Sequence, residues 1–176
     1  GPAYQALIPG LVKREDVPDT WEGLLDPKWK GRIVVRDVRA SATMKTIYGA
    51  IIYKEWKRTG SLDDGFALLD RLHANTGAYA ATPEVMFTLL SAPESAYALT
   101  PWNQFDALGR KHNHGLPFGY VIPKETPVIV EPIAIVKGAP HPEEAKLFYD
   151  FVTSQEQLLH AAEKYFRLPA RPDLPP

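Results

Sequence analysis

The sequence predicts an α/β fold in which a largely parallel sheet is covered by helices on both faces. Short β-branched or apolar runs alternate with amphipathic helical segments of roughly 10 to 17 residues. This alternation favours parallel pairing, because two neighbouring parallel strands are joined by a crossover helix. No internal repeat or low-complexity segment breaks the pattern before a proline-rich end that starts at Pro169.

The first elements follow from local residue chemistry. Residues 1–20 are expected to be irregular, and a short helical turn is expected over Trp21–Leu25. The β-branched run Ile33–Val35 is typical of a buried strand. A helix is expected over about residues 41–58, because its apolar residues recur every three or four positions. Those residues are Met44, Ile47, Tyr48, Ile51, Ile52 and Trp56.

The later elements are expected on the same grounds. Ser61 is a suitable N-cap for a second helix, and Thr82-Pro83-Glu84 has the residue order of a helix start. Further helices are expected at 61–75, 82–91, 101–111, 142–151 and 154–165, and strands or extended segments at 77–81, 97–99, 118–122 and 128–136.

The composition excludes several classes of function. The 176 residues carry a formal net charge of −1, so no electrostatic footprint indicates nucleic acid or an anionic membrane surface. The sequence contains no cysteine, which excludes disulfides and thiolate metal sites. It also has no run of about 18 apolar residues, the length that a membrane-spanning helix needs.

Two further features bear on the origin of the chain. Gly1-Pro2 resembles the remnant that a protease leaves after removal of a purification tag, so we expect the native start to lie upstream. Proline is frequent, with 17 residues, and asparagine is rare. Both trends are typical of proteins from thermophiles.

Three segments carry a resemblance to a known family. Residues 17–33 read VPDTWEGLLDPKWKGRI, Ser41-Ala42-Thr43 opens a helix, and residues 138–146 read GAPHPEEAK before a Ser-Gln-Glu-Gln helix start. In this order they resemble family 1 extracellular solute-binding proteins of ABC importers, the group of ferric-iron, thiamine, polyamine and phosphonate carriers. The first segment is the most specific, because residue types and spacing agree over its whole length.

The resemblance implies a lobe of the type II periplasmic-binding-protein fold. Relatives have two α/β lobes, and their ligand lies in the cleft between them. Residues 1–130 would form the second lobe, and residues 131–176 would form a return segment and C-terminal helices that pack across both lobes. The first lobe would be absent, so this chain would hold half of the site and expose apolar surface that favours self-association.

The best local candidate for ligand contact is Ser41, Ala42 and Thr43. A helix N-terminus offers free N–H donors and a positive dipole end, and hydroxyl groups beside it add donors and acceptors. Ordinary N-capping explains the same residues without a ligand. The family resemblance makes ligand contact as plausible as capping alone.

The second candidate is Trp102, Asn103 and Gln104, which follow Pro101 after an expected strand. Open α/β sheets bind ligands at the carboxyl ends of their strands. Trp102 offers a face for stacking or is a core residue, and the two amides offer directional donors and acceptors. Ferric-iron relatives carry two tyrosines at about positions 103 and 104. Their absence argues against phenolate ligation of Fe³⁺ and favours a small organic or polyatomic solute.

Other polar residues have simpler explanations. His112 and His114 lie in a polar helix exit with no carboxylate or thiol beside them, which indicates a solvated loop rather than a metal site. The pairs Asp63-Asp64 and Glu143-Glu144 fall in first turns of helices, where the dipole favours acids. The sequence has no nucleophile-elbow motif and no glycine-rich phosphate loop. We therefore expect no catalytic residue, no cofactor and no metal.

The sequence thus predicts a transport protein rather than an enzyme. Its expected partners are a small solute, an ABC permease in the membrane and the first lobe, and its expected location is periplasmic or extracellular. The alternative is a stand-alone effector-sensing domain of a regulatory protein that reuses the same lobe. A small α/β enzyme is the third and weakest hypothesis.

Overall fold

The fold is built around two short strands that are buried on both faces. In the computed structural model, which describes residues 3–7, 13–116 and 118–174, β2 (Ile33–Arg36) is buried along its whole length. β4 (Leu99–Asn103) is buried likewise. Strands that are covered on both sides occur in sheets with helices on both faces, as the sequence predicts.

The sheet is mixed, with four strands in one direction and β1 (Ala3–Leu7) antiparallel between β4 and β5 (Gly119–Val121). Its order is β3-β2-β4-β1-β5, where β3 is Thr76–Ala80. β2 pairs in parallel with β3 and with β4, whereas β1 is antiparallel to both β4 and β5. The predicted fold class is confirmed, and the antiparallel strand β1 is an addition to it.

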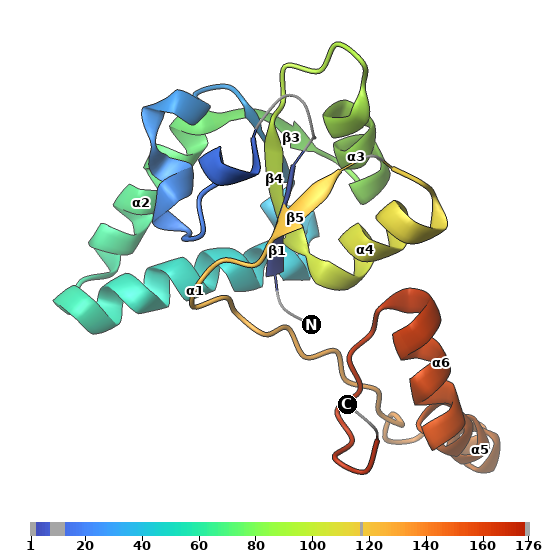
Figure 1. Ribbon diagram of the computed structural model, residues 1–176. Helices are drawn as coiled ribbons and strands as arrows, with labels where there is room; N and C mark the ends of the chain where they lie inside the picture. Colours follow the sequence, from blue (N-terminus) through green and yellow to red (C-terminus); the bar gives the residue numbers. More distant parts are fainter. Residues whose placement is uncertain (1–2, 8–12, 117, 175–176) are drawn as a thin grey trace.

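Helices cover the sheet on both sides (Figure 1). α2 (Leu62–Asn75) and much of α1 (Ala42–Thr59) lie on one side, and α3 (Pro83–Ser91) and α4 (Gln104–Asn113) lie on the other. α5 (Pro142–Val152) and α6 (Gln155–Tyr165) form a separate pair that projects below the sheet. Among the described residues, no helix is long and apolar enough to cross a membrane.

Residues 17–33 lead into β2 and pack against α2 on one side of the sheet. The short 3₁₀ helices at Arg14–Asp16, Glu22–Leu25 and Pro27–Trp29 lead into β2. Leu24 and Trp29 are fully buried against α2 and the sheet. The buried amide of Asn75 donates from Nδ2 to the carbonyl oxygens of Leu24 and Asp26, at 2.8 Å each. A single side chain at the end of α2 thereby satisfies the backbone of this irregular segment.

The structure differs from the sequence expectations at three places. Residues 1–20 are not all irregular, because 3–7 form β1 in the middle of the sheet. Pro101 lies inside β4 rather than at a helix start, and α4 begins only at Gln104. A proline is tolerated there because the parallel pairing of β4 with β2 is limited to Ile33 and Leu99.

The third difference concerns the expected extended segment at 128–136. Apart from a single bridge residue at Val128, its backbone forms no strand, and Val130 and Val136 are 77% and 71% exposed. An apolar run predicts a buried strand only when a second surface covers it. No described part of this chain does so.

The packing of α1 against α2 generates a prediction about two glycines. A Cβ on Gly65 would lie 2.6 Å from the Ile52 Cα, whereas a Cβ on Gly49 would meet nothing within 4 Å. Gly65→Ala should lower the free energy of unfolding by about 1–3 kcal/mol through overpacking. Gly49→Ala should raise it by about 0.5–1 kcal/mol because alanine favours the helix. Urea unfolding measures both, and equal effects of the two changes would contradict this packing.

Candidate functional site

Three helix N-termini meet at one edge of the sheet. α1 follows β2, α3 follows β3 and α4 follows β4, and these three strands run parallel. Their carboxyl ends therefore lie at the same edge, and the helices begin there. Open α/β sheets bind ligands at this edge, and free N–H groups with positive dipole ends favour anions.

The start of α1 is held by Ser41. Its buried hydroxyl accepts from the Met44 N–H at 3.2 Å, which is the N-cap bond expected from the sequence. Ala42 is exposed and Thr43 is half-buried in the first turn. One capping bond leaves further first-turn N–H groups without an intrahelical acceptor, because a helix start has four such donors.

The start of α4 is held by Asn103, which also contacts α1. Its Oδ1 accepts from the Asp106 N–H at 3.0 Å, and its Nδ2 donates to the Thr43 Oγ1 at 3.5 Å. Asn103 is buried at the end of β4. The structure thus brings the two predicted segments together, 60 residues apart in the sequence.

Trp102 lies in the core beneath this contact. Its side chain is 5% exposed, and its Nε1 donates to the Asp106 Oδ2 at 2.7 Å. The Asp106 Oδ1 accepts from the Arg110 Nε at 3.0 Å. Of the two possibilities that the sequence left open, burial is what this structure shows. Ligand contact by Trp102 stays a prediction.

Gln104 presents an unsatisfied acceptor beside the site. It is buried at the first position of α4, and its Oε1 has no hydrogen-bond partner among the described residues. Its Nε2 donates to the Phe166 carbonyl oxygen at 3.4 Å. A buried unpaired polar atom costs about 1–3 kcal/mol, so a donor group at this place would be stabilised.

Arg36 is a buried charged residue at this edge that the sequence reasoning did not single out. It ends β2, is buried, and uses Nη1 to donate to the Ala80 carbonyl oxygen at 3.2 Å and the Asp37 carbonyl oxygen at 3.5 Å. A guanidinium has five N–H donors and always carries its charge. The signal in the sequence was an arginine directly after the apolar run Ile33–Val35. A cation that is buried at the end of a strand needs hydrogen-bond acceptors or an anion.

Two ion pairs lie around this edge. Arg39 and Asp37 bond to each other through side chains at 2.9 and 3.3 Å, and the hydrogen bond from Arg39 lowers the pKa of Asp37. Arg110 of α4 pairs with Glu84 of α3 at 2.9 Å. Hydrogen bonds from Arg110, from the Glu84 backbone and from Thr82 lower the pKa of Glu84 to about 2.

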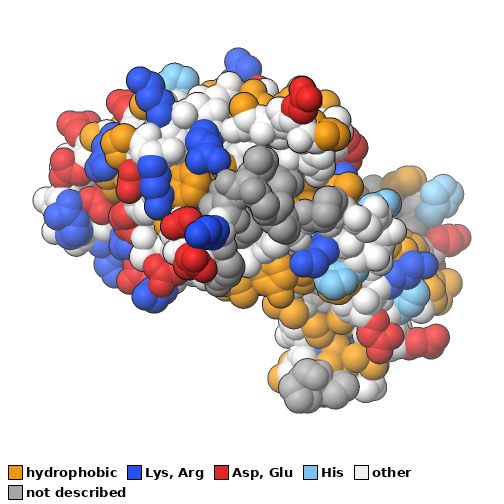
Figure 2. Space-filling view, turned by 45° about the horizontal axis from the view of Figure 1, so that its top comes forward, with side chains coloured by type: hydrophobic (Ala, Val, Ile, Leu, Met, Phe, Trp, Pro, Cys, Tyr) orange, Lys and Arg blue, Asp and Glu red, His pale blue; other side chains and the backbone are white. Residues whose placement is uncertain are grey.

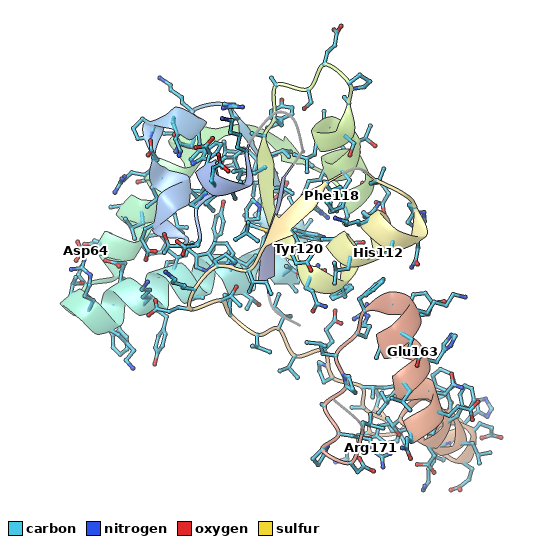
Figure 3. All side chains as sticks on the ribbon, in the orientation of Figure 1. Asp64, His112, Phe118, Tyr120, Glu163 and Arg171 are labelled. Carbon is cyan, nitrogen blue, oxygen red and sulfur yellow. The ribbon has the colours of Figure 1, made fainter. Side chains whose placement is uncertain are left out.

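The C-terminal pair of helices contacts α4. The Asn113 Nδ2 donates to the Lys164 carbonyl oxygen at 2.9 Å, and the rings of His112 and Phe166 lie 5.3 Å apart. Figure 3 labels His112 on α4, above α6. Arg167 lies over the Phe105 ring, with 3.7 Å from its Cζ to the centroid, and forms an ion pair with Glu131. These contacts tie the segment to one helix of the lobe.

The histidines do not form a metal site in the described part of the chain. No group of three or more His, Asp or Glu side chains there has the proximity to hold a metal ion. His73 instead shares a 2.7 Å hydrogen bond with the Tyr79 hydroxyl.

Comparison with known proteins identifies what the chain is similar to. Residues 10–176 match the family described as bacterial extracellular solute-binding protein. The chain is 26% identical to a putative 2-aminoethylphosphonate-binding periplasmic protein of Salmonella typhimurium, over 98% of this chain and 51% of that protein. It is 27% identical to a probable ABC transporter periplasmic-binding protein of Sinorhizobium fredii, over 98% and 48%.

Solved structures of periplasmic binding proteins resemble the chain in fold. The periplasmic binding protein AfuA of Actinobacillus pleuropneumoniae, with bound fructose-6-phosphate, superimposes with a TM-score of 0.74 at 28% identity, over 94% of this chain and 50% of that one. A ferric binding protein of Campylobacter jejuni shares the fold, with a TM-score of 0.78 at 18% identity, over 99% of this chain and 56% of that one. The chain spans about half the length of the curated relatives it matches.

The pairing of Glu84 with Arg110 predicts an acid-dependent stability. The pKa of Glu84 is lowered from 4.5 to about 2, so its contribution is present above pH 4.5 and is lost as the pH falls towards 2. Glu84→Gln should flatten the stability profile between these values. Urea unfolding at a series of pH values measures this effect. Glu94→Gln, which removes an exposed carboxylate after the same helix, is the control, and an equal change there would contradict the assignment.

Proposed function

This chain belongs to the bacterial extracellular solute-binding protein family, and from that premise we propose that it binds the solute of an ABC importer. The carboxyl edge of β2, β3 and β4 would form one wall of the binding cleft. Closure of a second lobe over that wall would enclose the solute before it passes to the membrane permease. The location that goes with this function is the periplasm or the cell surface. The family consists of binding proteins rather than enzymes.

We propose that the solute carries a phosphate or phosphonate group. Two helix starts, a hydroxyl at Thr43 and an amide at Asn103 surround the same place, and Arg36 is a buried positive charge at the end of β2, on the same edge of the sheet. Backbone N–H groups and a guanidinium are the partners that oxyanions prefer. The relatives named for 2-aminoethylphosphonate and solved with fructose-6-phosphate support this class of solute.

The unpaired Gln104 Oε1 supports a donor group elsewhere on the same molecule. This oxygen accepts from no described residue. Gln104 is the first residue of α4, the helix that Asn103 caps. An ammonium or hydroxyl group would satisfy this acceptor. Phosphorylated sugars carry hydroxyl groups, and aminoalkylphosphonates carry an ammonium group. We therefore expect a solute with an anionic group at one end and a hydrogen-bond donor at the other.

We further propose that residues 1–130 are the second lobe and that residues 131–176 pack across to a first lobe. Neither α5 nor α6, which the structure describes in full, has a buried residue. Leu147, Phe148 and Phe151 on α5 are 70%, 62% and 56% exposed. Figure 2 shows hydrophobic side chains at the surface of this projecting part. A first lobe that packs on this surface would also cover the apolar run at 128–136, which belongs to none of the strands β1–β5.

The regulatory alternative has less support. The curated relatives with assigned names are called periplasmic-binding proteins, and nothing in the described residues adds an effector-domain feature. A helix-turn-helix upstream in the gene would favour regulation, whereas a signal peptide would favour transport.

A titration with 2-aminoethylphosphonate tests the proposed function. The chain alone should bind with a Kd weaker than about 100 µM, because one wall of a cleft leaves the solute partly hydrated. Amide chemical shifts should change at residues 42–44 and 103–106. Thr43→Val should weaken binding by about two- to ten-fold, the effect of one hydrogen bond.

Thr46→Val is the matched control for this titration. The Thr46 hydroxyl lies three residues further along α1, is exposed and donates to the Ala42 carbonyl oxygen. Binding should be unchanged in this variant. Shift changes confined to surface lysines, or equal effects of the two threonine variants, would contradict the proposed wall.

The exposed face of α5 predicts concentration-dependent association. The double change Leu147→Ser and Phe148→Ser should reduce the average mass at high concentration, because contiguous apolar patches drive association. Its thermal stability should be unchanged, since both side chains are exposed. Light scattering after size exclusion measures the mass, and Phe66→Ser on α2 is the control. A strictly monomeric unmodified chain would contradict the prediction.

A further inference from the structure

The C-terminal end of α6 has a backbone conformation that is rare for its residue type. Phe166, which follows the last residue of the helix, has φ 56° and ψ 29°, in the left-handed region. Its N–H donates to the Ala162 carbonyl oxygen at 3.1 Å and closes the helix. α1 ends in the same way at Gly60, with φ 78° and ψ 0°. Glycine adopts this conformation without steric cost, whereas a Cβ atom opposes it.

The contacts of Phe166 account for a phenylalanine at this position. It is one of two non-glycine residues with positive φ in the described part of the chain. Such residues persist where the surrounding structure holds them, and they gather at functional places. The Phe166 ring lies 5.3 Å from the His112 ring of α4, and its carbonyl oxygen accepts from the Gln104 Nε2 at 3.4 Å. The left-handed conformation therefore places a ring and a carbonyl group against the same helix.

The residues on either side of Phe166 extend this contact. The Lys164 carbonyl oxygen accepts from the Asn113 Nδ2 at 2.9 Å. The Arg167 guanidinium lies over the Phe105 ring, with its Cζ 3.7 Å from the centroid. Residues 164–167, which we call the α6 joint, thus contact α4 in both its first and its last turn. Figure 1 shows α6 beneath α4.

α4 depends on contacts of this kind because it buries little of its own surface. Of its residues, all of which the structure describes, only Gln104 and Ala107 are buried. α3, which begins at the same edge of the sheet, buries Met86, Phe87 and Leu90. The α6 joint therefore supplies part of what holds α4 in place. One of the residues that it contacts, Gln104, is the first residue of α4.

The Phe166 carbonyl group also decides how the Gln104 amide is turned. A carbonyl oxygen accepts hydrogen bonds and cannot donate them, so the amide must present its nitrogen to it. The opposite orientation would bring two acceptor oxygens together. A change in the backbone conformation of Phe166 would remove this preference and release the amide.

We propose that Phe166 is a positioning residue for solute binding: its left-handed conformation aims its carbonyl group at the Gln104 amide and thereby fixes the start of α4. This positioning rests on the proposed function, in which the starts of α1 and α4 form the solute wall. Because residues 131–176 are proposed to pack across to a first lobe, the α6 joint would also connect the position of that lobe to the wall.

Two substitutions separate the backbone conformation of Phe166 from its ring. Phe166→Gly removes the ring and adopts the left-handed conformation freely, whereas Phe166→Val removes the ring and disfavours that conformation, because valine is β-branched. Nuclear magnetic resonance of the Gln104 side-chain amide protons reports the hydrogen bond directly, and Gln104→Met assigns the signals. The bonded proton should shift upfield in Phe166→Val and should stay close to its original position in Phe166→Gly.

Titration with 2-aminoethylphosphonate measures the consequence for the wall. Phe166→Val should weaken binding about two- to ten-fold, the effect of one hydrogen bond. Phe166→Gly should weaken it less than about two-fold, because the carbonyl direction is kept. Circular dichroism confirms folding of each variant. Arg167→Ser, which removes the contact with Phe105, replaces Phe166→Val where that variant is unfolded, with the same expected loss of affinity.

Tyr165→Val is the matched control. It removes an aromatic ring from the preceding residue, where the ring is exposed and faces His160 on α6 itself. Neither the Gln104 signal nor the affinity should change in this variant. Effects equal to those of Phe166→Val would show a general disturbance of the helix end and would overturn the proposal.

Three further results would also overturn it: an unmoved Gln104 signal in Phe166→Val, equal effects of Phe166→Gly and Phe166→Val, and a shifted signal with unchanged affinity. The Gln104 signal is recorded without solute, so it tests the positioning of the amide even where the unmodified chain does not bind 2-aminoethylphosphonate. That failure of binding contradicts the proposed function instead.

Discussion

The burial of β2 and β4 on both faces is the constraint on which the rest of the structure depends. Ile33, Val34, Val35 and Leu99 are fully buried, and each such side chain contributes about 1.5–3 kcal/mol. Because helices cover both faces, crossover connections join neighbouring strands of this part of the sheet, and β2 pairs in parallel with β3 and β4. Since each strand is followed by a helix, α1 and α4 must begin at the same edge of the sheet.

The proposed binding wall follows from that edge with few dedicated residues. Every helix start has unpaired N–H groups that need acceptors, and two such starts lie side by side where Asn103 contacts Thr43. Capping and ligand binding therefore use the same chemistry, which is why the sequence alone could not separate them. The buried charge of Arg36 and the unpaired oxygen of Gln104 are not explained by capping, and they give the wall a direction from anion to donor.

The sequence predicts the helices well and the strands less well, for physical reasons. The helix faces of α1 and α2 are visible in apolar spacing, which is a local property. Strand β1 depends on partners about 100 positions away, in the register Ala3 with Asn103, and has no local signal. Pro101 suggested that a helix starts or follows there. A proline is tolerated within β4 because the pairing of β4 with β2 is limited to Leu99 and Ile33. Arg36 was missed because one residue after an apolar run resembles an ordinary strand end. The apolar run 128–136 predicts an extended segment, but apolar character alone does not say which surface covers it, and Val130 and Val136 are exposed.

A crystal structure of the chain with 2-aminoethylphosphonate at saturating concentration tests the central claim most directly. The account predicts phosphonate oxygens within hydrogen-bond distance of backbone N–H groups at the starts of α1 and α4, near the Thr43 hydroxyl and the Arg36 guanidinium. Phosphonate bound only at surface lysines, with the edge of β2 and β4 empty, would contradict it.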